Sequence, residues 1–210
     1  MCAVRWLIAI VAIAGIGWLF PLFHVVPLRT ATAEKVAATF NAAQFAENFW
    51  TNHLTASLDK TVKAETLLPL IQGDSAAAKK KFSRSVGLSE SYYYFVSGSG
   101  RVVAVSDDGI SLAVADHSTN AEISLQTGLV FGDAVRDSTG LLNASDYANS
   151  QDFNDISSAL NHIVETRVLP KLREQAKVGA KISFAGCAEV DDESTDLKPL
   201  KVIPIQATTE

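Results

Sequence analysis

The stretch from position 92 to position 106 reads Tyr92-Tyr-Tyr-Phe-Val-Ser-Gly-Ser-Gly-Arg-Val-Val-Ala-Val-Ser. Its β-branched and aromatic residues favour a strand. Two glycines, Gly98 and Gly100, interrupt it. Glycine inside a strand marks a bulge or a sharp bend. The sequence therefore predicts one long strand that bends near its middle.

Two further strands are predicted after the bent one. Asp107-Asp-Gly109 is a tight hairpin signal, and alternation resumes over residues 110–115. A turn at residues 118–120 precedes a third strand over residues 121–126. The stretch 129–136 either extends that strand or begins a fourth.

A long amphipathic helix is predicted after a loop-rich segment, over Asn154–Lys177. Asn154 or Ser150 caps its start, Pro170 kinks it, and Gly179 ends it. Two final strands follow, over Lys181–Val190 and Leu200–Thr208. The apolar positions recur at helical spacing, at Ile156, Leu160, Ile163, Val164, Val168 and Leu172.

Three strands, a helix and two more strands is the order of an OB-type barrel, whose helix lies between its third and fourth strands. We therefore expect an α+β fold, with an OB-like five-stranded antiparallel β-barrel over residues 92–210 and flanking helices. The long helix is expected against the open end of the barrel. A generic α+β sandwich is the alternative.

Residues 29–91 are predicted to form a helical appendage. Phe45, Phe49 and Trp50 lie on one face of an Ala-rich helix, which we expect to pack outside the barrel. Two short helices follow, one ended by Gly73 and the next capped by Asp74. The lysine run at positions 79–81 is expected to be a solvated face.

Residues 1–28 are predicted to form a single-pass transmembrane anchor. Trp6 to Leu28 contains no Asp, Glu, Lys or Arg, and it exceeds the about 20 apolar residues that cross a bilayer. No lipobox follows it. A cleaved signal peptide is the alternative, with a weak Ala-x-Ala site at Ala31–Ala33. The short N-terminal tail favours an inner-membrane protein whose soluble domain is periplasmic.

Composition narrows the classes of partner and cofactor. The chain has 18 Lys+Arg against 23 Asp+Glu, a net charge of −5. An acidic surface does not attract polyanions over long range, so nucleic acid and anionic lipid are not expected as the main partner. Cys187 has no partner on its side of the membrane, so we interpret it as a small buried hydrophobe. No metal-ligand spacing or catalytic motif is present, so no cofactor or metal is expected.

Five polar residues are the candidate site: Arg136, Asp137, Asp146, Asn149 and Asn161. In one interpretation Arg136 binds an anion or sugar hydroxyls in a polar pocket. In the other, Arg136 pairs with Asp137 or Asp146 and fixes the loop to the helix, while Asn161 bonds the loop backbone. The second interpretation is favoured.

Eight segments occur in a characteristic order: Phe23–Leu28, Asn41–Phe45, Trp50, Tyr94–Val105, Gly132–Asp137, Asp146–Tyr147, Asn149 and Ala159–Asn161. They resemble one bacterial family, the predicted periplasmic lipoproteins known as domain of unknown function 2291. The resemblance covers about residues 23–207. Phe23 stands where family members often carry a lipobox cysteine, which favours a retained helical anchor.

The resemblance implies an accessory role in solute uptake, because family members are similar to neighbours of sugar ABC-transporter genes. It implies no catalytic residue. We therefore expect a membrane-anchored periplasmic accessory or binding protein without enzymatic activity, with ABC-transporter components as partners and an unknown ligand. An envelope hydrolase that uses carboxylates near Asp137 and Asp146 is the alternative.

Overall fold

The computed structural model describes residues 40–87, 90–115, 118–147 and 149–210. Residues 41–210 form one compact unit. The predicted anchor, residues 1–28, lies outside the described residues, as does the start of the Ala-rich helix. Among the helices that are described, none combines the length and the apolar character needed to cross a membrane.

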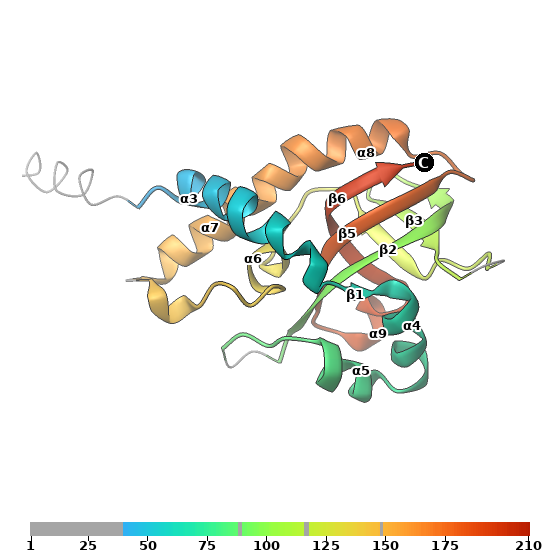
Figure 1. Ribbon diagram of the computed structural model, residues 1–210, viewed down its shortest axis with the longest axis horizontal. Coiled ribbons are helices and arrows are strands. Elements are labelled where there is room, and N and C mark those ends of the chain that lie inside the picture. The colour runs from blue at the N-terminus through green and yellow to red at the C-terminus, as the bar shows by residue number, and fades with distance from the viewer. Residues whose placement is uncertain (1–39, 88–89, 116–117, 148) are drawn as a thin grey trace, which may run out of the picture. The chain divides into compact units, whose positions relative to one another are not determined.

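Six strands form one sheet, in which five are joined in a closed circuit of pairings (Figure 1). β2 pairs with both β3 and β5, so the circuit runs β2–β3–β4–β6–β5 and returns to β2. The strands are β1 (Val62–Lys63), β2 (Tyr92–Val105), β3 (Gly109–Ala113), β4 (Ile123–Gln126), β5 (Lys181–Val190) and β6 (Leu200–Thr209).

Two pairings correct the expectation of a wholly antiparallel, five-stranded arrangement. β4 runs parallel to β6, with Ile123 opposite Leu200. The short β1 adds to β2, also in parallel. Parallel neighbours need a long connection between them. The chain between β4 and β6 provides one, because it passes through the helices and β5 first.

β2 has its bulge just beyond the position predicted from Gly98 and Gly100. Its first ten residues, 92–101, pair with β5 without interruption, and residues 101–105 pair with β3, with the bulge between Val102 and Ala104. The two glycines are needed because the strand has close neighbours at both positions. A Cβ on Gly98 would lie 2.8 Å from the Ala64 Cβ, and one on Gly100 would lie 2.9 Å from the Ala113 carbonyl oxygen.

The inner face of the sheet holds the main hydrophobic core. Tyr92, Tyr94 and Val96 of β2 belong to it, so the alternation of a strand directs Tyr93 and Phe95 to the outer face. α4 (Ala64–Gly73) contributes to the same core through Leu67, Leu68 and Ile71. α5 (Ser75–Phe82) follows, and the Asp74 carboxylate accepts a hydrogen bond from the Ala77 N–H, which confirms the predicted cap.

In chain order the long helix lies between β4 and β5, which are the third and fourth strands of the circuit along the chain, as predicted. It consists of α7 (Ser150–Ile163), the π-helical turn η4 (Val164–Val168) and α8 (Leu169–Gln175). Its cap is Asn149, not Asn154 or Ser150. The wide turn precedes Pro170, because proline has no N–H for the regular ladder and its ring clashes with the preceding turn.

α3 (Ala42–Phe49) lies against α7 (Figure 1). It continues into the π-helical turn η1 (Trp50–Leu54) and the 3₁₀ helix η2 (Thr55–Lys60). Phe49 and Trp50 are buried, as their helical spacing predicts. Phe45 contacts Tyr147 edge-on, with ring centres 6.0 Å apart.

The stretch 129–136 is not a strand, contrary to both options considered from the sequence. It is a loop followed by the short helix α6 (Ala134–Asp137). Gly132 has φ +80°, which ends extended structure, and the Asp137 N–H bonds the Asp133 carbonyl oxygen. The helix α9 (Glu193–Asp196) joins β5 to β6.

Candidate functional site

α6 carries Arg136 and Asp137 into the interior, where they are 4% and 1% exposed. The Arg136 Nε donates to Asp137 Oδ1 at 2.7 Å, and Nη2 donates to Oδ2 at 2.8 Å. Both carboxylate oxygens are therefore engaged by one guanidinium. Such a bidentate pair is among the stronger polar contacts in proteins and fixes geometry as well as charge.

The same guanidinium attaches α6 to α7. The Arg136 Nη1 donates to the Phe153 carbonyl oxygen at 3.2 Å, and the Arg136 Cζ lies 3.6 Å from the centre of the Phe153 ring. Asp133 adds a second carboxylate, 3.1 Å from Nη2. The guanidinium is thus enclosed by two carboxylates, a carbonyl oxygen and an aromatic face, and all three of its nitrogens have a partner.

Opposing effects act on the pKa of Arg136. Burial lowers it, but the hydrogen bonds and charge of Asp137, together with the charge of Asp133, raise it more. The net pKa is above the ordinary value. Arg136 is therefore a permanent cation, and its charge balances the carboxylates of Asp137 and Asp133.

Two further side chains of α7 hold the loop before α6. The Ser157 hydroxyl donates to Asp133 Oδ1 at 2.7 Å, and the Asn161 amide donates to the Gly132 carbonyl oxygen at 3.0 Å. Within the described chain, the buried Asn161 Oδ1 has no hydrogen-bond partner. Helix α7 thus fixes residues 132–137 from three successive turns.

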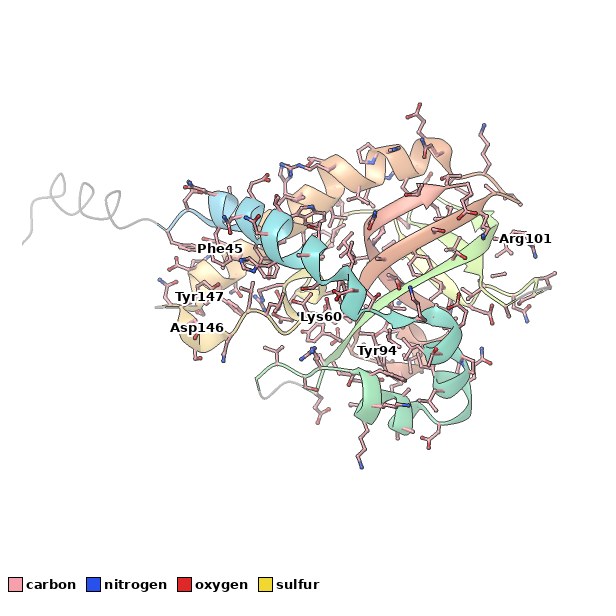
Figure 2. The ribbon with its side chains drawn as sticks, viewed as in Figure 1. Phe45, Lys60, Tyr94, Arg101, Asp146 and Tyr147 are labelled. Atoms are coloured by element: carbon pink, nitrogen blue, oxygen red, sulfur yellow. The ribbon has the colours of Figure 1, made fainter. Side chains whose placement is uncertain are left out.

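The structure brings Arg136, Asp137 and Asn161 together around residues 132–137, but not Asp146 or Asn149. Asp146 is exposed in η3 (Ala144–Asp146), on the loop that leads to α7, next to Tyr147 (Figure 2). Asn149 is the cap of α7: its side-chain Oδ1 accepts a hydrogen bond from the Asp152 N–H at 2.8 Å. Neither residue bonds Arg136.

A groove of about 810 Å³ lies on the outer face of β4, β5 and β6, beside this cluster. Gly132, which Asn161 holds, lines one edge. Leu129 and Phe131 stand 75% and 73% exposed at the same edge. β4, β5 and β6 contribute Ser124, Gln126, Cys187, Glu189, Lys201 and Ile203. The remaining lining residues are Gly109 at the start of β3, Asp196 at the end of α9, and the loop residues Ser106, Asp108, Gly128 and Asp191.

The groove is mostly acidic. Its lysine, Lys201, is paired with Asp196 at 3.0 Å. Glu189 is half-buried and accepts a hydrogen bond from the Tyr93 hydroxyl at 3.0 Å. Burial raises the pKa of Glu189, and the charges of Asp191 and Asp133 add to this against the lowering effect of Tyr93. The groove therefore offers hydrogen-bond acceptors beside an exposed aromatic ring.

A family model described as predicted periplasmic lipoprotein (DUF2291) matches residues 7–208. The chain belongs to this family. The resemblance seen in the sequence is thereby confirmed, and the family description implies a periplasmic, membrane-associated location. A search of the curated proteins gave no match.

The fold of this family member is similar to a crystal structure of an OB-fold protein from Thermotoga maritima. The two share 25% identity with a TM-score of 0.72, over 82% of this chain and 99% of the other. The predicted OB-type, α+β fold is thus supported by a solved structure.

Sequence reasoning missed the acidic groove of this family member. Its signal was present in β5, where Glu189 interrupts an apolar strand. A charged residue at an outward position of a central strand marks a place where that face is not covered. The loop with Phe131 gives no such signal, because the residue pattern of the stretch 129–136 favours a strand.

Proposed function

We propose that the chain is a membrane-anchored periplasmic accessory protein without catalytic activity, which binds a sugar during uptake through an ABC-type transporter. The observation that carries the proposal is the outer-face groove. It has hydrogen-bond acceptors along its floor and an exposed Phe131 at its edge. The same edge is held in place by the hydrogen bond from the Asn161 amide to the Gly132 carbonyl oxygen.

The chemistry of the groove suits a neutral, polyhydroxylated solute. Carboxylates and the Gln126 amide accept hydrogen bonds from hydroxyl groups, and an aromatic ring covers the apolar face of a sugar. The half-buried Glu189 is held by Tyr93 and so is pre-oriented. Preorganised groups bind with a smaller loss of conformational entropy.

A hydrolase that uses Asp137 and Asp146 has less support. Asp137 is 1% exposed and both of its oxygens bond Arg136. A general acid or base must reach the proton it transfers, and this carboxylate faces a guanidinium instead. Asp146 is exposed in a loop, outside the residues that line the groove.

The proposal is tested in a strain that lacks the chain. Uptake of a panel of labelled sugars is measured with no copy, with the wild-type chain, and with Phe131→Ala. Val178→Ala is the matched control, because Val178 is also exposed but lies outside the groove. We expect uptake of one class of sugar to fall without the chain and to return with the wild type and the control, but not with Phe131→Ala. Equal uptake of every sugar in all strains would contradict the proposal.

A further inference from the structure

A second cavity of about 450 Å³ lies on another part of the molecule. Its walls come from the end of η2 and the start of β1, from the end of α5, and from the turn after α6. Figure 2 shows Lys60 where η2 leads into β1. The lining residues are Ser57, Lys60, Thr61, Val62, Lys81, Phe82, Arg84, Phe95, Ser138, Thr139, Gly140 and Leu141.

This cavity is basic in an acidic protein. Lys60, Lys81 and Arg84 line it, and none of its lining residues is acidic. The whole chain carries −5. None of the three cations forms an ion pair with a carboxylate in the described part of the chain. Three cations around a cavity without a neutralising carboxylate create a local positive potential that favours an anion.

Hydroxyl groups supply further donors. Thr139 Oγ1 accepts the Leu141 N–H at 3.3 Å, which leaves its proton free to donate. The Ser138 hydroxyl is 1% exposed and has no hydrogen bond of normal geometry to any described residue. It lies near the thiol of Cys187, which is a weak hydrogen-bonding group. Burial raises the pKa of this thiol to about 12, although the nearby Ser138 hydroxyl lowers the pKa in part.

The turn after α6 positions Arg84. Gly140 has φ +65°, and a Cβ there would lie 2.9 Å from the Arg84 Nη1 and 3.0 Å from its Cδ. The turn therefore lies directly against the side chain of Arg84. Arg136 and Asp137 immediately precede this turn, so the buried ion pair also anchors one wall of the cavity.

We propose that this cavity binds the phosphate group of an anionic ligand. A guanidinium, two ammonium groups and hydroxyl donors together suit a phosphate group, which carries negative charge on several oxygens. The phosphate belongs either to a soluble phosphate ester or to the headgroup of a membrane lipid. This inference uses residues outside the acidic groove and does not depend on sugar binding there.

The full-length chain, in a non-ionic detergent at pH 8, is titrated calorimetrically with inorganic phosphate and with glycerol 3-phosphate. We expect saturable binding at one site that weakens with salt, because charge dominates it. Lys81→Gln and Arg84→Gln should each weaken binding about tenfold or more, the typical effect of a charge-assisted hydrogen bond. Lys80→Gln is the matched control, since Lys80 neighbours Lys81 on α5 but does not line the cavity.

Lipid nanodiscs distinguish the two sources of phosphate. The chain is placed in discs of phosphatidylcholine or of phosphatidylglycerol, and glycerol 3-phosphate is titrated again. Equal binding in both discs identifies a soluble phosphate ester. If glycerol 3-phosphate binds more weakly in phosphatidylglycerol discs than in phosphatidylcholine discs, and this difference disappears in Arg84→Gln, the ligand is a lipid headgroup. Absence of saturable binding to the wild type, or an equal loss with Lys80→Gln, would overturn the proposal.

Discussion

Arg136 and Asp137 are neighbours in sequence, yet their side chains form a two-bond ion pair inside the protein, at 2.7 and 2.8 Å. Neighbouring residues of a helix ordinarily point in different directions. Here α6 is only four residues long, from Ala134 to Asp137, and the guanidinium turns back to its own helix. The pair then reaches α7 through the Phe153 carbonyl oxygen.

Replacing Arg136 by Ala should lower the stability of the fold strongly. The change leaves the Asp137 carboxylate buried without a partner, and losing one member of a buried pair costs about 3–5 kcal/mol. For a domain of this size the melting temperature should fall on the order of 10 °C. Thermal unfolding followed by circular dichroism measures it.

Arg167→Ala is the matched control for that experiment. Arg167 pairs with Glu47 on the surface, and both side chains are about half exposed. Exposed pairs contribute about 0–1 kcal/mol, so this variant should melt close to the wild type. An unchanged melting temperature for Arg136→Ala would instead assign Arg136 to a ligand.

Glu189→Gln should alter how stability depends on pH. The pKa of Glu189 is raised in the folded protein, so its contribution to stability is present below the unfolded pKa and is lost as pH rises through the folded pKa. Glutamine does not titrate. The stability of the variant relative to the wild type should therefore increase from pH 4 to pH 8, as measured by urea unfolding at each pH. A constant difference would contradict this prediction.

Gly186→Ala should destabilise the sheet where β5 meets β6. The new Cβ would lie 2.5 Å from the Val202 Cγ1 and closer still to the Ile203 carbonyl oxygen. Backbone cannot yield easily, so we expect a loss of about 3 kcal/mol or more of unfolding free energy. Gly73→Ala is the control, because nothing lies within 4 Å of its added Cβ. It should be neutral or slightly stabilising.

Fusion of a reporter after Glu210 tests the predicted topology. A reporter that is active only in the cytoplasm should be silent, because the domain is expected in the periplasm behind an uncleaved anchor within Trp6–Leu28. N-terminal sequencing of the membrane-bound protein should then recover the start of the chain. Reporter activity would overturn the orientation, and a mature N-terminus near residues 32–34 would show cleavage instead.

Local patterns in the sequence determined much of the fold. The Asp74 cap and the bounds of β5 follow from side-chain chemistry within a few residues. The order of strands and helix also predicted the OB-type arrangement. The cap and the strand are local features, because capping and alternation depend on neighbours in the chain.

Only the tertiary structure decided which distant residues meet. Lys60 lines one cavity with Lys81 and Arg84, although β1, α4 and most of α5 separate it from them in the sequence. The parallel pairing of β4 with β6 and the helical conformation of α6 were also not predicted. The physical reason is that such contacts depend on closure of the sheet and on packing against α7, and no short-range periodicity records those long-range interactions.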